Sequence, residues 1–262
     1  MDLNGRVLFL CDDAALLLAQ WQGRSLTLAS AGPLRHDVST DEITPVAILS
    51  HYDDRLGRYP YTGLTVGGLR PIGPNAVREG GFAVVVAGQR YGKGSSREHS
   101  PMAEKLAGIR LVIAESFERI YRQNADNIGL FTSTDFSLVE RIQRGDAIDV
   151  EELVAGRDAL AAGILRAGGL LAFGQRHLQG VAHGANDPDE SSAPARPLTL
   201  FEKIIHRHLL PTPLTPAQPQ AGEGVFVRAH WRFIHEYYTG MCAHMLHTRF
   251  GKPLVLQDVA SM

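Results

Sequence analysis

Residues 82–114 read FAVVVAGQRYGKGSSREHSPMAEKLAGIRLVIA, and this stretch decides the class of fold. Its two ends, FAVVVAG and LVIA, are short apolar runs rich in β-branched residues, which is typical of strands buried on both faces. Between them PMAEKLAG has a helical pattern, with Pro101 suited to a first turn and Gly108 to a C-terminal stop. Residues 116–130 then read as a helix followed by a turn. This order of elements predicts an α/β fold with parallel strand pairing.

The loop between the first strand and the helix, GQRYGKGSSREHS at residues 88–100, concentrates small, hydroxylic and cationic side chains. Because it follows a strand and precedes a helix, free backbone N–H groups and the positive end of the helix dipole favour an anion there. Glycine permits close backbone approach and positive φ. Arg97 adds a planar two-pronged donor for a carboxylate or a phosphate. A glycine turn with solvated charges is the alternative, but it leaves the Ser-Ser-Arg-Glu-His run unexplained.

The loop does not fit a nucleotide phosphate loop. That motif needs GxxxxGK followed by Ser or Thr. Here QRY alone separates Gly88 from Gly92, and Lys93 is followed by Gly94. Both the spacing and the hydroxyl are therefore wrong for a nucleotide.

Composition and charge narrow the class of protein. The chain has 262 residues, of which 44% are hydrophobic and 21% charged, as in an ordinary soluble globular protein. A net charge of −2 gives no general attraction to nucleic acid or to an anionic membrane. No apolar run approaches the roughly 18 residues that a membrane span needs. Asp12 and Asp13 interrupt the apolar N-terminal stretch, so no signal peptide is expected. We expect a cytoplasmic protein without nucleic-acid or membrane partners.

No metal site is expected on the chain. Cys11 and Cys242 are its two cysteines, which gives neither a disulfide framework nor a metal-ligand spacing. The histidines of the C-terminal region are spaced too loosely for a metal site. They are His206, His208, His230, His235, His244 and His247.

Shifts in composition predict three parts. Residues 1–175 alternate short apolar runs with helical patterns, whereas residues 176–197 are rich in Gly, Ala, Asp, Ser and Pro and predict a linker. Residues 198–262 follow it. They begin with a helical pattern in which Thr199 is the expected N-cap and Glu202 completes a capping box.

Two further elements are expected after that helix and a proline-rich loop. A second helical pattern runs through residues 237–246, and PLVLQDV at residues 253–259 reads as a strand.

GSSREH, residues 94–99, resembles the signature of the swivel domain of the aconitase superfamily, and most closely that of the small subunit of 3-isopropylmalate dehydratase and homoaconitase-type enzymes. Other stretches agree in order: VSTDEITP at 38–45, IRLVIAESFERIYRQNADNIGL at 109–130, and RGDAIDV at 144–150, where the family has a late strand. The resemblance covers roughly residues 35–175. It implies an α/β swivel domain of the β/β/α type over residues 1–175, followed by the linker and a short partial C-terminal segment.

The last part resembles the large, catalytic subunit of the same enzymes. TLFEKI at 199–204 is similar to its opening, and VFVRAHWRFIHEYYTG at 225–240 to its next segment. The resemblance implies that residues 198–262 are the incomplete start of a catalytic domain whose cluster-binding cysteines lie farther along. No cofactor is therefore expected on this chain. A four-iron–four-sulfur cluster is expected on the catalytic partner, a large subunit or domain.

The resemblance also implies a reaction, the removal and re-addition of water across a hydroxy di- or tricarboxylic acid, which in the dehydratase serves leucine biosynthesis. It assigns the base to Ser95, whose alkoxide needs stabilisation by backbone N–H groups and by Arg97. Arg97 would bind a substrate carboxylate, and Ser96 would add a hydrogen bond. Asp41 matches the acidic residue of the early turn, where positioning is favoured over proton transfer. Arg58 is the choice for a second substrate-binding arginine, with Arg55 as its alternative.

Several residues are expected to support the loop rather than to react. They are Gly92, Gly94, Glu98, His99, Asn124 and Asn127. Asp41 also fits a plain helix cap, and the two asparagines fit the shaping of a turn. Lys93 departs from the acidic or small residue common in the family, which leaves the substrate open.

Two classes of function follow. The first is a hydro-lyase component that is inactive without its cluster-bearing partner and acts on a small carboxylic acid. The alternative is a non-catalytic carboxylate-binding or regulatory module of the same fold. A third reading, a piece of a longer fused enzyme, stays open; a downstream frame with Cys-x-x-Cys and an Asp-His pair would support the enzyme.

Overall fold

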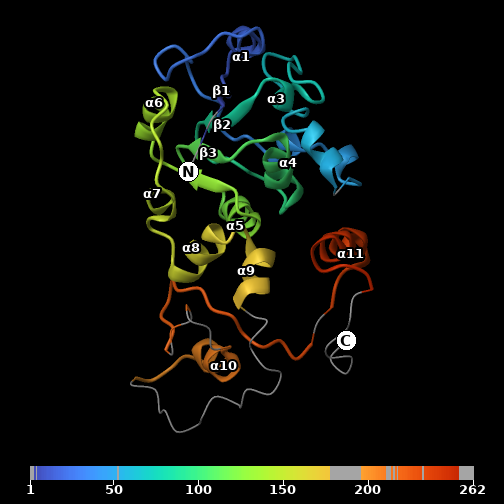
Figure 1. Cartoon of the computed structure of the whole chain (residues 1–262), viewed down its shortest axis with the longest axis vertical. Helices are drawn as coiled ribbons and strands as arrows, with labels where there is room; N and C mark the ends of the chain where they lie inside the picture. Colours follow the sequence, from blue (N-terminus) through green and yellow to red (C-terminus); the bar gives the residue numbers. More distant parts are fainter. Residues whose placement is uncertain are drawn as a thin grey trace. The chain divides into compact units, whose positions relative to one another are not determined.

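The computed structural model describes residues 3, 5–51, 53–177, 196–210, 214, 216, 218–231 and 233–253. Contacts divide the chain into two compact units, residues 1–155 and 156–262, each of which is described by itself (Figure 1). Most of the expected linker and nearly all of the expected last strand lie outside the described residues.

A four-stranded parallel sheet forms the centre of the first unit, in the order β1-β2-β3-β4. The two strands predicted from the sequence are β2 and β3, and every residue in them is buried. The α/β prediction is therefore confirmed. The strands are β1 (Arg6–Phe9), β2 (Phe82–Ala87), β3 (Leu111–Ala114) and β4 (Phe131–Ser133).

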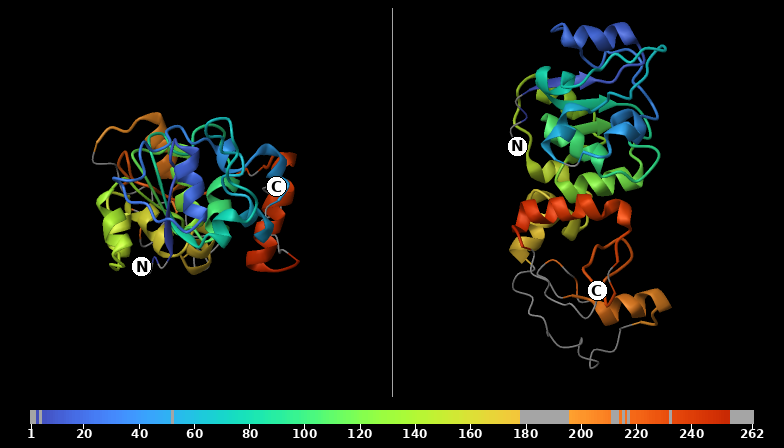
Figure 2. Two further views of the ribbon diagram at one scale, coloured as in Figure 1. Left: turned by 90° about the horizontal axis from the view of Figure 1, so that it is seen from above. Right: turned by 90° about the vertical axis from the view of Figure 1, so that its right-hand side faces the viewer.

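Helices enclose this sheet. Figure 1 shows α4 to one side of the strands and α6 and α7 to the other, and both views of Figure 2 show the strands inside this unit. The α-helices of the first unit are α1 (Ala14–Trp21), α2 (Thr40–Ile43), α3 (Ala76–Glu79), α4 (His99–Ala107), α5 (Arg119–Ile128), α6 (Ser137–Gln143) and α7 (Val150–Val154). Two short 3₁₀ helices, η1 (Val46–Ile48) and η2 (Asp54–Arg58), lie between α2 and α3.

The main core lies on one face of the sheet. Leu8, Val85 and Val112 stand opposite one another on three neighbouring strands, and all are fully buried. Tyr121 and Ile128 of α5 pack on the same cluster. Full burial of one such aliphatic side chain stabilises by about 1.5–3 kcal/mol. This core therefore fixes the C-terminal ends of β2 and β3, and the glycine-rich loop begins at the end of β2.

The helix predicted before Gly108 ends as expected, and both α4 and α5 end on glycines in the left-handed region. Gly108 after α4 has φ 109°, and Gly129 after α5 has φ 76°. The late strand expected around RGDAIDV is not formed. Residues 144–149 are instead a loop that buries Ile148 and leads into α7, where Asp149 and Glu152 form a capping box.

The second unit contains helices α8 (Ala159–Arg166), α9 (Leu170–His177), α10 (Leu200–His208) and α11 (Glu236–Phe250). α8 and most of α9 lie within the predicted 1–175 domain, but both pack in a small core of their own unit with Leu214 and Phe226. The expected capping box of Thr199 and Glu202 is confirmed at α10. Leu200 and Phe201 remain 75% and 71% exposed, so α10 packs only partially. The assignment of residues 198–262 to a catalytic domain stays a prediction.

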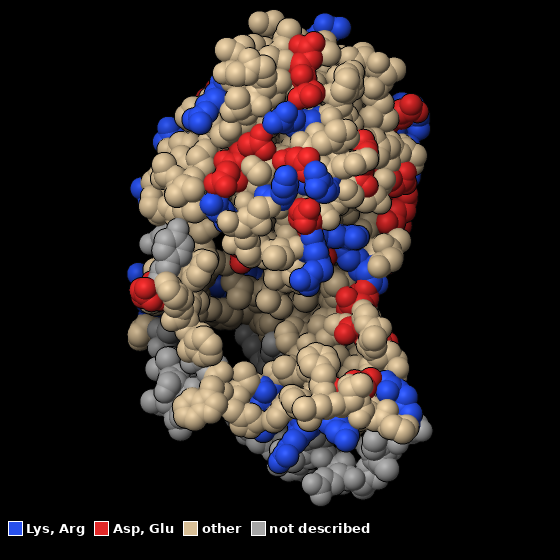
Figure 3. Space-filling model, turned by 180° about the vertical axis from the view of Figure 1, so that it is seen from behind, with Lys and Arg blue, Asp and Glu red and all other residues tan. Residues whose placement is uncertain are grey.

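Within the described residues, no helix is long and apolar enough to cross a membrane. The same part of the chain holds no group of three or more His, Cys, Asp or Glu side chains that could bind a metal ion. On the face seen in Figure 3, Lys and Arg side chains lie next to Asp and Glu side chains.

Removal of the N-cap of α1 tests the energetics of the first unit. The Asp13 carboxylate accepts hydrogen bonds from the backbone N–H groups of Ala15 and Leu16, at 2.7 and 3.2 Å. We expect Asp13→Ala to lower the free energy of unfolding by about 1 kcal/mol. Asp13→Asn, which keeps an acceptor, should lose much less. Urea denaturation of the three proteins measures both values, and an equal loss in the two variants would contradict the cap.

Candidate active site

The glycine-rich loop leads from the end of β2 to the start of α4. Ser95 and Ser96 are exposed, and α4 begins at His99. The N-cap residue, Glu98, makes no side-chain capping bond. Both serines are therefore exposed near a helix N-terminus, whereas Arg97 is half-buried, and the chemical roles of all three remain predictions.

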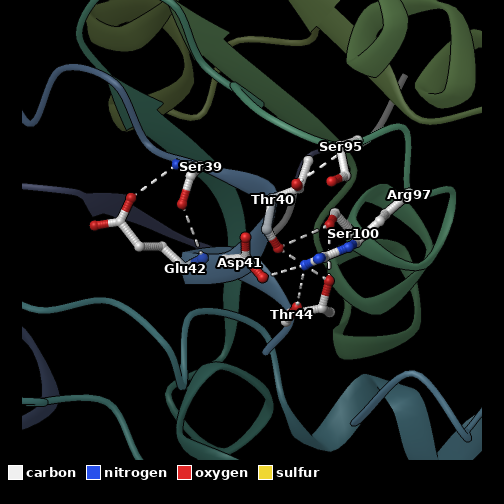
Figure 4. A network of polar contacts seen from close by, with 8 residues as sticks. All are labelled: Ser39, Thr40, Asp41, Glu42, Thr44, Ser95, Arg97 and Ser100. Carbon is white, nitrogen blue, oxygen red and sulfur yellow. Dashed lines mark hydrogen bonds and ion pairs between the residues drawn. The ribbon is translucent and has the colours of Figure 1, made fainter. Parts of the chain in front are cut away.

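A second segment, residues 37–40, runs beside the loop. The Asp37 N–H donates to the Gln89 carbonyl at 2.8 Å, and the Thr40 N–H donates to the Lys93 carbonyl at 2.8 Å. Between them, the N–H groups of Gly92 and Lys93 both donate to the carbonyl of Val38. This pairing brings the start of α2, with Asp41, next to the loop (Figure 4).

Arg97 points across the site toward α2 (Figure 4). Its Nη1 donates to the Asp41 carboxylate and, at 3.4 Å, to the Thr44 carbonyl. The Arg97 side chain is 14% exposed, whereas that of Asp41 is 57% exposed. Among the described residues, Nε and Nη2 of Arg97 have no hydrogen-bonding partner. One edge of the guanidinium thus has two parallel N–H groups without a partner in this part of the chain, which is the geometry that pairs with a carboxylate.

Buried hydroxyls join α2 to α4 beneath the ion pair. Thr44 Oγ1 and Ser100 Oγ lie 2.7 Å apart and share a hydrogen bond, and each lies 3.2 Å from the Thr40 carbonyl oxygen, to which the other hydrogen is donated. Thr40 Oγ1 in turn donates to the Ser95 carbonyl at 3.2 Å (Figure 4). These bonds fix the backbone on both sides of Arg97.

Gly92 and Gly94 are required by geometry. Gly92 has φ 81°, and a Cβ there would lie 2.2 Å from Cγ of Tyr121. Gly94 has φ 107°, with Thr40 Oγ1 at 3.4 Å from its Cβ position. The loop backbone therefore rests on the Tyr121 ring, a contact that excludes any side chain at residue 92.

Glu98 and His99 support the loop from inside. Burial raises the pKa of the half-buried Glu98 carboxyl. His99 is 6% exposed, and burial lowers its pKa, helped by the charge of Arg97 and opposed by a hydrogen bond with the Leu49 backbone. Its Nε2 has no partner in the described part of the chain. A neutral, buried imidazole fits a packing role.

The other candidate cations have contacts outside the Ser95–Arg97 segment. The Arg58 guanidinium sits over the Tyr59 ring, 5.8 Å from its centroid, and bonds to no loop residue within the described ranges. Arg55 pairs with Asp53 at 2.8 Å. Lys93 lies 3.7 Å from Asp37, whose pKa is lowered chiefly by a hydrogen bond from Arg90. Arg58 as a substrate-binding residue stays a prediction.

Two expectations about local structure are corrected. Ser39, not Asp41, is the N-cap of α2, and it forms a capping box with Glu42. Asp41 is thereby free to bond with Arg97. Asn124 and Asn127 lie inside α5 rather than in a turn, because the helix continues to Ile128 before the left-handed Gly129.

Comparison with known proteins adds to this geometry. Residues 75–134 match the family described as the aconitase C-terminal domain. The small subunit of 3-isopropylmalate dehydratase from Halothermothrix orenii is 40% identical over 116 residues, which is 44% of this chain and 66% of that protein, just under two thirds. Small subunit 2 from Methanopyrus kandleri is 40% identical over 139 residues, 52% of this chain and 75% of that one.

The chain belongs to the family of 3-isopropylmalate dehydratase small subunits. A solved 3-isopropylmalate dehydratase structure from Methanocaldococcus jannaschii covers 54% of this chain and 88% of its own, at 30% identity and a TM-score of 0.40. The family match and the Methanopyrus kandleri relative confirm the sequence resemblance to the swivel domain.

An iron–sulfur cluster does not fit Cys11, one of the two cysteines of the chain. Cys11 is fully buried, its Sγ donates to the Phe9 carbonyl at 3.4 Å, and burial raises the pKa of its thiol to about 11. A cluster ligand must be a thiolate, which this environment disfavours. The expectation of a cluster on a partner remains untested.

The sequence did not reveal the buried hydrogen-bonded cluster of Glu104 and three tyrosines that supports the loop. Glu104 of α4 is fully buried and bonds to the hydroxyls of Tyr61, Tyr91 and Tyr121. A glutamate on a helix face that carries small and apolar residues was the available signal. Its partners come from three separate segments, so no spacing pattern identified them.

The contact between Gly92 and Tyr121 gives a test with an internal control. Gly145 has φ 83° and no atom within 4 Å of its Cβ position. Gly145→Ala should therefore cost only the left-handed strain, about 1–2 kcal/mol. Gly92→Ala should cost a further ~1–3 kcal/mol, because the new methyl collides with the Tyr121 ring. Equal losses in urea denaturation would show that the loop does not rest on that ring.

Proposed function

We propose that this chain supplies the substrate-binding and proton-abstracting half of a hydro-lyase that acts on small hydroxy dicarboxylic or tricarboxylic acids. One observation carries the proposal. The two-nitrogen edge of Arg97 lies in the same loop as exposed Ser95 and Ser96, ahead of an α-helix whose N-terminus has no side-chain cap. The names of the relatives, 3-isopropylmalate dehydratase small subunits, support this reading and a role in leucine biosynthesis.

The chemistry needs a base, because dehydration removes a proton from carbon while hydroxide leaves the adjacent carbon. In this proposal Ser95 Oγ takes that proton. A serine alkoxide is a strong base but is costly to form. The positive end of the α4 dipole and the buried charge of Arg97 lower that cost. Rehydration returns the proton from Ser95 to carbon.

Arg97 binds a carboxylate of the substrate in the same scheme. Asp41 accepts from Nη1 and holds the guanidinium in one orientation, which leaves the Nε and Nη2 edge for a bidentate pair. Ser96 adds a hydrogen bond to the same group. Asp41 is thus a positioning residue, since its carboxylate touches Arg97.

The leaving hydroxyl needs a Lewis acid, which the described part of the chain does not offer. We infer that a large catalytic partner, with the four-iron–four-sulfur cluster expected from the family, supplies it. Each half should then be inert without the other.

The role of Ser95 is tested in the reconstituted enzyme. Ser95→Ala should lower kcat by roughly a hundredfold or more while KM changes little, because a base acts mainly in the transition state. Ser96→Ala should raise KM more than it lowers kcat. The assay is run on the purified chain with and without an anaerobically reconstituted partner. Turnover by the isolated chain, or full activity with Ser95→Ala, would refute the assignment.

The role of Arg97 is tested by its geometry. Arg97→Ala should raise KM by about tenfold to a hundredfold, the loss expected for a charged hydrogen-bonded pair. Arg97→Lys should recover only part of it, because an ammonium cannot form the two-pronged pair. Steady-state kinetics measures both. Normal kcat/KM in both variants would remove the substrate-binding role.

The same experiments distinguish the proposed hydro-lyase component from the non-catalytic alternative. If isopropylmalate binds the chain in an Arg97-dependent manner while the reconstituted complex never turns over, the chain is a carboxylate-binding module.

A further inference from the structure

The cluster of Glu104 and three tyrosines lies directly beneath the glycine-rich loop. Tyr61, Tyr91 and Tyr121 are 0–2% exposed and Glu104 is 0% exposed. Tyr91 immediately precedes Gly92, and the Tyr121 ring supports the Gly92 backbone. Glu104 sits on α4, the helix that the loop enters. Three of the four members are therefore attached to the loop or in contact with it.

Tyr61 connects the cluster to α2. Its N–H donates to the Ile43 carbonyl at 2.8 Å, and its φ of 65° turns the chain back toward that helix. A Cβ on nearby Gly63 would lie 2.3 Å from the Asp41 carbonyl oxygen, so the backbones touch. Glu104 thus joins the segments that carry Asp41, Ser95 and Arg97.

The hydrogen atoms of the cluster can be counted. Tyr61 and Tyr121 hydroxyls lie 2.5 Å from Oε1 and Oε2 of Glu104, the Tyr91 hydroxyl also bonds to Oε1, and the Tyr61 and Tyr91 hydroxyls are 2.8 Å apart. These are four contacts between oxygens, but three phenols bring only three protons. An ionised Glu104 leaves one contact without a hydrogen.

A protonated Glu104 supplies the missing hydrogen. Its Oε1–H donates to Tyr61, Tyr61 donates to Tyr91, Tyr91 donates to Oε1, and Tyr121 donates to Oε2. Every contact then holds one proton. When the carboxyl ionises, the ring formed by Tyr61, Tyr91 and Oε1 loses one hydrogen. Two of its three oxygens then face each other without a hydrogen between them. Their lone pairs repel, which pushes apart the segments that carry them.

We propose that Glu104 is a positioning residue that, in its protonated form, closes this ring and holds the glycine-rich loop in register with α2. Ionisation of Glu104 opens the ring and loosens the loop. The proposal rests on the proposed function only for what the loop does, since the ring itself is a property of the isolated chain.

Electrostatics agree with this geometry. Burial raises the pKa of the Glu104 carboxyl from the ordinary 4.5 to about 7, against the three tyrosine hydrogen bonds, which lower it. The groups that face Glu104 are these three phenols, whose pKa values burial raises well above the ordinary 10. The neighbouring Lys105 on α4 instead donates to the Ile128 carbonyl at the end of α5.

The sign of the pH dependence follows. Between pH 4.5 and about 7 the folded chain keeps a proton that the unfolded chain releases. Stability therefore falls as pH rises through this window and levels off above it. The folding equilibrium should weaken by roughly a hundredfold or more across the window.

The test uses the full chain with Glu104→Gln, which keeps the shape and a donor but cannot ionise. Glu140→Gln, an exposed substitution on α6, is the matched control. Between pH 5 and 8.5 the Tm of the wild type and of Glu140→Gln should fall relative to that of Glu104→Gln. At pH 8, backbone amides of residues 92–98 should exchange about tenfold faster in the wild type than in Glu104→Gln, since about a tenth of the carboxyl stays protonated. At pH 5.5 the two rates should agree.

Tyr121→Phe keeps the test valid if Glu104→Gln does not fold. It removes a donor to the carboxylate, so the midpoint of the wild-type pH dependence should move to higher pH. A wild-type Tm that runs parallel to that of Glu104→Gln, loop exchange equal in both at pH 8, or an unmoved midpoint in Tyr121→Phe would overturn the proposal.

In the reconstituted enzyme, kcat/KM of the wild type should fall as pH rises through about 7, and Glu104→Gln should flatten this profile. A complex without turnover, with the exchange pattern intact, counts against the proposed function and leaves the role of Glu104 standing. A flat wild-type profile in an active complex counts against Glu104.

Discussion

The site depends on the pairing of residues 37–40 with residues 89–93. Four backbone hydrogen bonds join these segments, which are far apart in the sequence. Each such bond contributes only about 0.5–1.5 kcal/mol, but together they set which residue of α2 faces the loop. Without this pairing Asp41 does not reach Arg97, and the guanidinium has no fixed orientation. The geometry of the site is therefore a consequence of non-local backbone pairing.

Beneath that pairing, the first unit places a titratable carboxyl where most proteins place an apolar side chain. Transfer of an unpaired carboxylate into a protein interior costs several kcal/mol, which is why such groups are paired or neutral. Three tyrosine hydroxyls satisfy Glu104, and they also limit the positions that four segments can take relative to one another. An apolar residue at the same position would pack as well, but it would not define the positions of three hydroxyls.

In Arg97, one nitrogen orients the guanidinium and the other two remain for binding an anion. Asp41 and the Thr44 carbonyl accept from a single nitrogen, and the remaining edge is free for a planar anion. A lysine could not divide its charge in this way, because its donors share one nitrogen. The position of the residue in a loop before α4 adds the dipole of that helix to its own charge. Both features suit a planar anion.

Much of the fold follows from local chemistry, and the sequence alone determined that part. The apolar runs of β2 and β3, the glycine end of α4 and the capping box of α10 depend on neighbouring residues, so their patterns were sufficient. The position of Ser95 and Ser96 between a strand and a helix followed from the same local order.

Only the tertiary structure decided which residues from distant segments contact one another. The capping box of Ser39 and Glu42 is a local pattern that the sequence reading missed, but the ion pair of Asp41 with Arg97 comes from tertiary structure. The asparagines fell inside α5, and the expected late strand became a loop because burial of Ile148 and a capping box favoured it. The contacts of Glu104 could not be predicted from the sequence. Its three tyrosines are scattered along the chain, and long-range packing, which leaves no periodic signal in a single sequence, brings them together.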